Sequence, residues 1–464
     1  MMQKHPRLLL TLSYSEGWER FAYYATQMLI VLYCVQKFNF TLEQAYALYG
    51  AVITCAFALP FFGGFIADRV LGHVPTIICG GFFLVISSLL LCIPTLPIFL
   101  LGLALFLVGS GLYNANCTAL VGNLYHDMPQ LRERGYTLFY MAMNIGATLG
   151  PLLFGITSAR FGWTIGFAVN GLGLGSVLFL FFKNMDKLRQ INIVNFKISF
   201  IKMAFLLAIF LLMVIMLYLV LKNALYFGDV LLPIAILTLV FLGYLVIKEA
   251  RETRRHIFLI IILSFLGMLF FTASFQIGSV LNVFIDKDVV HNAHWSLVMT
   301  SLYPLSVIVM APIINIIWQL LADKNKEPSE LGKLLVGLIF ASIAFLFFYG
   351  AAKSTTTGAF ALFDSVLGIW CFGIGELALM PAIFSSISRL APKDLQGTLM
   401  GTWFLFIAFA GYLSTVFNHF SIFIVHLVEN QKASFSAEFM ASSVIMLLIA
   451  LSYLALIPLI KKLR

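Results

Sequence analysis

The sequence predicts an all-α integral membrane protein, and three observations support this fold class. Hydrophobic residues fill 61% of the 464 positions, whereas charged residues fill only 11%. Phenylalanine alone occurs 46 times, which is far outside the composition of water-soluble domains. Apolar runs of about 20 residues, the helical length that crosses a hydrocarbon core of about 30 Å, recur along the whole chain. We therefore expect a protein that crosses a membrane many times as helices.

Fourteen transmembrane helices are expected from these apolar runs. Each run is bounded by turn residues or by charges, as helix ends at a membrane surface are. The predicted spans are 8–36, 44–68, 75–94, 97–124, 135–159, 163–183, 200–222, 229–248, 257–286, 295–322, 333–352, 358–390, 395–428 and 435–461.

The basic residues predict the orientation, because Lys and Arg residues that flank membrane spans stay on the cytoplasmic side. With a cytoplasmic N-terminus, 22 of the 29 Lys and Arg residues fall on the cytoplasmic side, six fall outside, and Arg20 lies within a span. This predicts a multi-pass protein of the cell membrane, the inner membrane of a bacterium, with both termini in the cytoplasm. The bias also explains the net charge of +9, so no nucleic-acid partner is expected.

The chain carries an internal repeat. Phe-Ile-Ala-Asp-Arg at 65–69 returns as Leu-Leu-Ala-Asp-Lys at 320–324, and Arg134-Gly135 has a similar echo in Gln396-Gly397. Parallel repeats in transporters form two bundles with the binding site between them. We expect an N-terminal six-helix bundle in residues 1–183, linkers and an inserted transmembrane hairpin in 184–256, and a C-terminal six-helix bundle in 257–464.

Three charges interrupt the first apolar span. Glu16, Glu19 and Arg20 are spaced i, i+3 and i+4, so they share one face of a helix. Each charge in a bilayer costs roughly 2.5 to 3.5 kcal/mol, so such groups are kept where they function. This predicts a site of ion coupling, and a static ion-pair cluster that only fixes helix packing is the alternative.

Enzymatic motifs are missing from the sequence. The eight histidines are scattered, and neither an HExxH nor a GxSxG arrangement occurs. The six cysteines fall in apolar runs without the spacing of metal ligands. We therefore expect neither an enzyme nor a bound metal or organic cofactor.

Several motifs resemble those of a known transporter family. GGFIADRVLG at 63–72 is similar to the loop signature of the major facilitator superfamily, and EGWERFAYY at 16–24 resembles the first-helix signature of the proton-dependent oligopeptide transporters. Further matches in the family order are FYMAMNIG at 139–146, QIGSVLN at 276–282, GELALMP at 375–381 and LAPKDLQGTLMGTW at 390–403. The resemblance implies the major facilitator fold, two six-helix bundles plus the inserted hairpin.

The resemblance also implies roles for individual residues. Proton coupling would fall to Glu16, Glu19 and Arg20, with the proton as the coupling ion. Asp68 and Arg69 would form a latch at the cytoplasmic helix ends. The residues that would bind the substrate are Tyr23, Tyr24, Gln27, Asn114, Asn144, Gln276, Tyr303, Glu376 and Trp403, with Glu376 holding an amino group. Asp286 would serve an extracellular gate, although a solvated loop charge explains it equally well.

Four positions depart from the family pattern, and two of them concern the carboxylate of a peptide. Gln27 and Asn114 stand where the family usually has an arginine and a lysine, its receptors for the carboxylate of a peptide. Tyr303 stands where the family motif has an asparagine, and Phe275 replaces an acidic residue. The loss of the two cations at Gln27 and Asn114 favours weaker binding of ordinary dipeptides.

The resemblance implies a proton-coupled symporter that imports di- and tripeptides or peptide-like solutes by alternating access. Two alternatives remain: a proton-coupled transporter of an amine-bearing solute that is not a peptide, and a nutrient sensor that has lost transport. The expected partners are the small-molecule substrate and membrane lipid, and the expected oligomeric state is a monomer.

Overall fold

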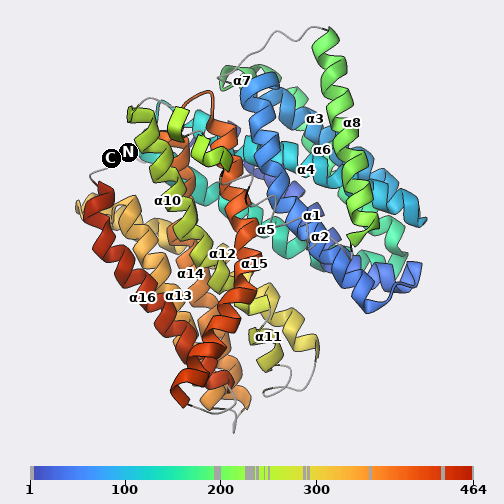
Figure 1. The fold of residues 1–464 in the computed structure, drawn as a ribbon. Coiled ribbons are helices and arrows are strands. Elements are labelled where there is room, and N and C mark those ends of the chain that lie inside the picture. The colour runs from blue at the N-terminus through green and yellow to red at the C-terminus, as the bar shows by residue number, and fades with distance from the viewer. Residues whose placement is uncertain are drawn as a thin grey trace. The chain divides into compact units, whose positions relative to one another are not determined.

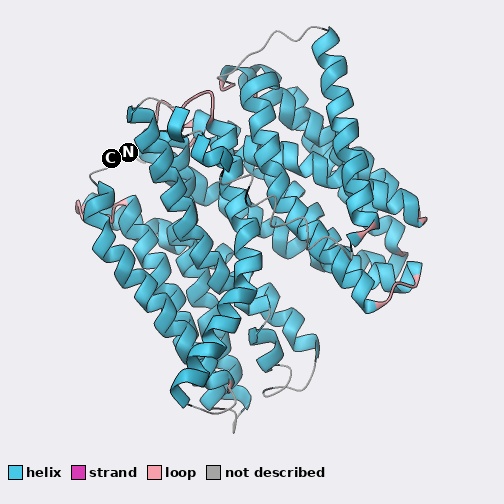
Figure 2. Cartoon of the chain, in the orientation of Figure 1, coloured by secondary structure: helices cyan, strands magenta, loops and turns pink. Residues whose placement is uncertain are grey.

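The structure is a computed structural model, and it describes residues 5–192, 200–224, 236, 240–244, 246–248, 251–278, 280–285, 289, 293–354, 358–429 and 434–461. These residues form helices joined by short connections, and no strand occurs among them (Figure 2). The described part of the chain is therefore all-α, as predicted.

Thirteen helices of 19 residues or more lie in the described part of the chain, each on one of the fourteen predicted spans (Figure 1). The predicted span 229–248 lies largely outside the described residues. The long helices are α1 (Leu8–Phe38), α2 (Leu42–Ile66), α3 (His73–Leu91), α4 (Leu96–Leu124), α5 (Pro129–Phe161), α6 (Trp163–Lys183), α8 (Phe200–Lys222), α10 (Arg251–Ser274), α12 (Ala293–Asp323), α13 (Glu330–Lys353), α14 (Gly358–Leu390), α15 (Gln396–Glu429) and α16 (Phe435–Lys461). Short helical segments are η1 (Ala67–Leu71), α7 (Met185–Gln190), η3 (Phe275–Gly278) and α11 (Val280–Phe284).

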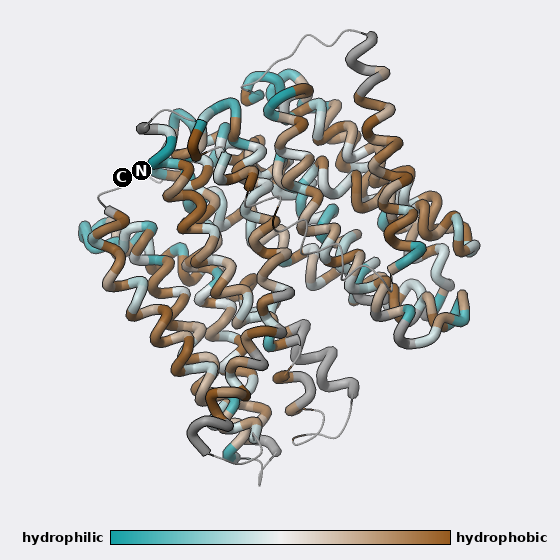
Figure 3. Tube along the Cα trace, viewed as in Figure 1, coloured by the Kyte–Doolittle hydropathy of each residue, from teal (hydrophilic) through white to brown (hydrophobic). Residues whose placement is uncertain are grey.

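The hydropathy of these helices fits a bilayer. Ten helices in the described residues are long and apolar enough to cross a membrane, judged by length and composition. Hydrophobic residues run along the helices, whereas hydrophilic ones gather mainly at helix ends and connections (Figure 3). Side chains such as Leu172, 76% exposed, and Phe179, 68% exposed, form an apolar outer surface that water would not tolerate but lipid does.

The helices form two compact units. Unit 1 comprises Met1–Ile260 and Ile387–Ala408, and unit 2 comprises Ile261–Ser386 and Phe409–Arg464. The C-terminal end of α14 and the first turns of α15 therefore pack with the N-terminal helices. The boundaries of the three predicted domains stay a prediction.

In unit 1, α1 packs along α5, α4 lies between α2 and α3, and α8 lies against α4. Glycine makes the α1–α5 contact close: a Cβ atom on Gly146 would overlap the carbonyl oxygen of Gly17. Likewise, a Cβ atom on Gly150 would overlap the carbonyl oxygen of Phe21. Small residues let two membrane helices approach at backbone distance. This contact fixes the middle of α1, where its charges lie.

A sharp turn connects the end of α2 to α3. The helix passes into the π-helical segment η1, which ends at Gly72 with φ of 82°. This left-handed conformation favours glycine, and α3 then starts at His73. Asp68 and His73 are brought onto the two sides of one turn.

In unit 2, α13 packs along α16. The hydroxyl of Ser342 donates to the Ser443 carbonyl oxygen at 2.9 Å, and the Ser443 hydroxyl donates to the Ser342 carbonyl oxygen at 2.9 Å. Such reciprocal bonds satisfy hydroxyl groups that have no water to bind in a membrane.

Candidate functional site

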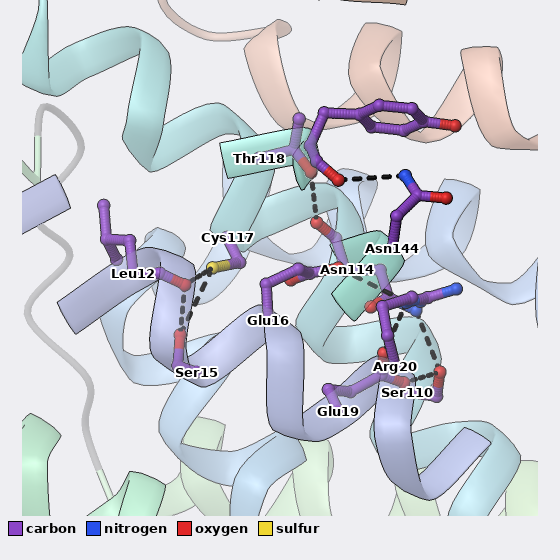
Figure 4. A network of polar contacts seen from close by, with 11 residues as sticks. Leu12, Ser15, Glu16, Glu19, Arg20, Ser110, Asn114, Cys117, Thr118 and Asn144 are labelled. Carbon is purple, nitrogen blue, oxygen red and sulfur yellow. Dashed lines mark hydrogen bonds and ion pairs between the residues drawn. The ribbon is translucent and has the colours of Figure 1, made fainter. Parts of the chain in front are cut away.

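The charges of α1 form one buried cluster in unit 1. Arg20 Nε lies 2.7 Å from Glu19 Oε2 and 3.5 Å from Glu16 Oε1. Both glutamates are 0% exposed and Arg20 is 5% exposed. Figure 4 shows the three side chains on one face of α1. The structure thus brings the three predicted coupling residues together in the protein interior.

Glu19 has further partners on α4. Ser110 donates its hydroxyl to Glu19 Oε1 at 2.6 Å, and Asn114, one turn later, donates its amide to Ser110 Oγ at 2.9 Å (Figure 4). Hydrogen bonds to a carboxylate are roughly twice as strong as bonds between neutral groups. Glu19 therefore contacts both Arg20 and Ser110, and Asn114 reaches the cluster through Ser110.

Glu16 is much less well satisfied. Neither of its oxygens accepts a hydrogen bond from an N–H or O–H group of the described residues, and the Cys117 thiol is the polar group beside it. Its ion-pair distance to Arg20 is 0.8 Å longer than that of Glu19, as the two distances above give. Two carboxylates and one guanidinium carry a net charge of −1 when both acids are ionised.

The predicted substrate residues of α1 continue from this cluster. The guanidinium carbon of Arg20 lies 5.3 Å from the ring centroid of Tyr23, within cation–π range. The rings of Tyr23 and Tyr24 meet edge to face at 5.0 Å. Gln27 donates its amide to the Tyr49 hydroxyl at 3.4 Å. Tyr23 is 2% exposed, and its hydroxyl has no hydrogen-bond partner among the described residues.

Two other predicted substrate residues of unit 1 are also buried. Asn144 on α5 donates its amide to the Tyr140 carbonyl oxygen at 3.0 Å, within its own helix (Figure 4). Trp403 on α15 is 0% exposed. Their contact with a solute stays a prediction.

Unit 2 holds the remaining predicted substrate residues. The Tyr303 hydroxyl donates to the Glu376 carboxylate, and Glu376 is 3% exposed. Gln276 donates its amide to the carbonyl oxygen of Ser414 at 2.7 Å and to its hydroxyl at 2.9 Å. Gln276 therefore ties η3 to α15, while Glu376 and Tyr303 form an acid–phenol pair.

The predicted latch residues lie at the end of α2. Asp68 accepts backbone N–H groups of Gly397 at 2.9 Å and Thr398 at 2.6 Å, in the first turn of α15. Arg69 Nη1 lies 3.6 Å from Asp394 Oδ2, and both side chains are exposed. The predicted gate residue Asp286 lies outside the described residues.

Three residues that the sequence analysis did not single out belong to these networks. Ser110 is the hydroxyl link between Asn114 and Glu19. His73 and Asn116 are buried next to Asp68. A signal for Ser110 exists, since it stands one helical turn before Asn114. The contacts of His73 depend on the turn at Gly72, which hydropathy does not reveal.

The long apolar helices and the buried, charge-bearing first helix are features of a multi-pass membrane protein. A sequence profile of the POT family matches residues 74–431, well over half of the chain. The chain therefore belongs to the POT family, as its motifs predicted.

Individual relatives agree with this assignment over nearly the whole chain. Dipeptide and tripeptide permease B of Yersinia enterocolitica is 27% identical over 444 residues, covering 89% of this chain and 86% of that protein. Dipeptide and tripeptide permease B of Photorhabdus luminescens is 25% identical over 418 residues, covering 87% of this chain and 85% of that protein.

A solved structure confirms the predicted fold. The crystal structure of a POT family transporter in complex with a thioalcohol conjugated peptide matches with a TM-score of 0.73 at 22% identity. The match covers 98% of this chain and 97% of that one. The prediction of an all-α membrane protein with the major facilitator fold is therefore correct.

Proposed function

We propose that this protein is a proton-coupled symporter that imports dipeptides and tripeptides. Its family and the permeases that it resembles support the substrate class. The observation that carries the coupling is the buried cluster of two carboxylates and one guanidinium in α1.

The cluster has the chemistry of a site for one proton. Burial of an unbalanced charge costs roughly several kcal/mol of folding free energy. The protein interior therefore favours a neutral cluster. Arg20 keeps its proton, and Glu19 is held as an anion by Arg20 and Ser110. Glu16, with the longer ion-pair distance, is the acid that takes the proton. Rehydration of Glu16 during turnover then releases the proton.

Substrate binding in this proposal uses the acid–phenol pair of unit 2. Glu376 accepts a hydrogen bond from Tyr303 and is buried, and a carboxylate is a hydrogen-bond acceptor when ionised. An ammonium group, such as the amino terminus of a peptide, is the donor that gains most from a buried carboxylate. Gln27 and Asn114 offer neutral amides where the resemblance leads one to expect cations, so peptide carboxylates should bind weakly.

The membrane placement is also part of the proposal. The distribution of Lys and Arg residues supports a bacterial inner-membrane protein with both termini in the cytoplasm, working as a monomer without a cofactor. In this orientation Asp68, Arg69 and the start of α15 lie at the cytoplasmic end. The extracellular gate at Asp286 stays a prediction.

Uptake by purified protein in liposomes tests the proposal. An inwardly directed proton gradient should drive accumulation of radiolabelled dialanine or trialanine above equilibrium, and collapse of the gradient with a protonophore should abolish it. Asp127→Asn, which neutralises a carboxylate 96% exposed on the surface, is the matched control and should transport like the wild type. The absence of accumulation for every di- and tripeptide, or accumulation that ignores the gradient, would contradict the proposal.

A further inference from the structure

A second buried titratable pair lies at the turn between α2 and α3. His73 is 0% exposed, and its Nε2 atom lies 3.7 Å from Asp68 Oδ1. Nε2 has no hydrogen-bond partner among the described residues. A buried imidazole nitrogen without a partner is rare enough to require an explanation.

Asn116 determines which ring nitrogen of His73 carries a proton. The Asn116 amide donates to the carbonyl oxygens of Gly63 at 3.0 Å and Leu112 at 2.8 Å, so its Oδ1 must face His73. His73 Nδ1 lies 2.9 Å from this Oδ1. Because an amide oxygen only accepts, Nδ1 must carry hydrogen. A neutral His73 would then turn the lone pair of Nε2 toward a carboxylate oxygen.

Asp68 in turn holds the start of α15. Its two oxygens accept the N–H groups of Gly397 and Thr398, which are among the first four N–H groups of that helix and have no partner within it. The positive end of the helix dipole also favours the carboxylate. This contact ties the first turn of α15 to the N-terminal helices within unit 1.

We propose that His73 is a proton-binding site that sets how firmly Asp68 holds the first turn of α15. A proton on Nε2 turns the unpaired lone pair into an imidazolium N–H directed at the carboxylate. The Asp68 charge is then balanced, and the contact with α15 is strong. Without that proton, two electron-rich atoms face each other in a dry environment, and the contact loosens. Acid strengthens the contact and alkali weakens it.

His73 and Asp68 are the two buried ionisable groups at this turn among the described residues. A proton on Asp68 is a poor alternative, because both of its oxygens already accept backbone N–H groups of α15. The charged residues of the adjoining segments are Arg69, Asp186, Lys187, Arg189, Lys393 and Asp394, all of them exposed, and the buried polar neighbours Asn116 and Asn192 do not titrate.

Hydrogen exchange in the first turn of α15 tests this site without any transport assay, so it stands apart from the proposed function. In the purified full-length protein, the protection factors of Gly397 and Thr398, corrected for intrinsic exchange, should rise at least about fivefold as the pH falls from about 8 to about 5. His73→Gln should remove this dependence. His126→Gln is the matched control, because His126 also contacts an aspartate, at 3.0 Å, but is exposed. Protection that does not change with pH in the wild type, or that changes equally in His73→Gln, would overturn the proposal.

Nitrogen-15 NMR of labelled histidine provides a second readout that holds even if the variant is unstable. The wild-type signal of His73 should show a proton on Nδ1 throughout and a proton gained at Nε2 as the pH falls. A neutral ring with its hydrogen on Nε2 would refute the assignment.

Discussion

Unit 1 buries two acid–base clusters, which differ in whether the acid or the base is the group that changes its protonation. In the α1 cluster the base is a guanidinium, which keeps its proton at every physiological pH, so a change of protonation must occur on an acid. In the cluster of Asp68 and His73 the acid is held by two backbone N–H groups, so the base is the group that changes. The identity of the base and the bonds of the acid decide which group carries the proton.

The same contrast exists within the α1 cluster. Glu19 accepts a hydrogen bond from Ser110 and pairs with Arg20 at 2.7 Å, whereas Glu16 pairs with Arg20 at 3.5 Å and accepts no N–H or O–H bond from the described residues. We propose different tasks for these two glutamates, one structural and one in proton exchange.

Removal of the shared cation should have the largest effect. Arg20→Gln leaves two buried carboxylates without a counter-ion, and breaking a buried ion pair costs about 3 to 5 kcal/mol of unfolding free energy. Reversible unfolding in mixed micelles measures this loss. Arg160→Gln removes an exposed arginine from the end of α5 and should change stability by less than about 0.5 kcal/mol. Equal losses in both variants would show that the α1 cluster is not an interior ion pair.

Neutralisation of the two glutamates should separate their tasks. Glu19→Gln should lose about 1.5 to 3 kcal/mol, the range for hydrogen bonds to charged groups, because it gives up its bonds with Ser110 and Arg20. Glu16→Gln should be neutral or stabilising at pH 7, since an uncharged amide replaces an acid that is proposed to hold a proton there. The same unfolding assay compares the two variants. A larger loss in Glu16→Gln would reverse the assignment of the anion and the proton carrier.

Loss of the Asp68 carboxylate should have a smaller effect on stability. Asp68→Asn removes a charged cap from α15, and loss of a helix cap costs about 1 kcal/mol. The expected local signature is faster hydrogen exchange at Gly397 and Thr398 at every pH. Unchanged exchange there would mean that the carboxylate does not hold the helix start.

His5 should have the smallest effect on stability. Acid should weaken its contribution, whereas acid is proposed to strengthen the contact at His73. It lies before α1, and its Nδ1 is 2.6 Å from the Tyr125 hydroxyl. Burial and the nearby Arg134 guanidinium lower the pKa of His5 below its usual value. The folded state therefore disfavours the proton, so the stability that His5 contributes is present above the pKa of the unfolded chain and is lost as the pH falls through the lower folded pKa.

The change should stay below about 1 kcal/mol, because His5 is partly exposed. His5→Gln should flatten this part of the pH–stability curve measured by unfolding between about pH 7 and about pH 5. A wild-type protein that gains stability through His5 on acidification would contradict this sign.

The membrane spans and the position of the α1 cluster could be predicted from the sequence, for physical reasons. Span lengths follow from bilayer thickness, and the spacing of Glu16, Glu19 and Arg20 places them on one face of any regular helix. The partition of roles between the acids could not be read, because it depends on Ser110, which reaches Glu19 only through the packing of α1 and α4.

The cluster at His73 was hidden for a similar reason. It requires the left-handed Gly72 and a contact between residues more than 300 positions apart in sequence, Asp68 and Gly397. Hydropathy and local spacing carry no information on such pairing.

The central claim, that Glu16 carries the coupled proton, is tested most directly by comparing driven and exchange transport in one liposome preparation. Glu16→Gln should lose accumulation of dialanine driven by the proton gradient but keep exchange of labelled for unlabelled dialanine across the membrane. Accumulation by Glu16→Gln at the wild-type level under the same gradient would contradict the account.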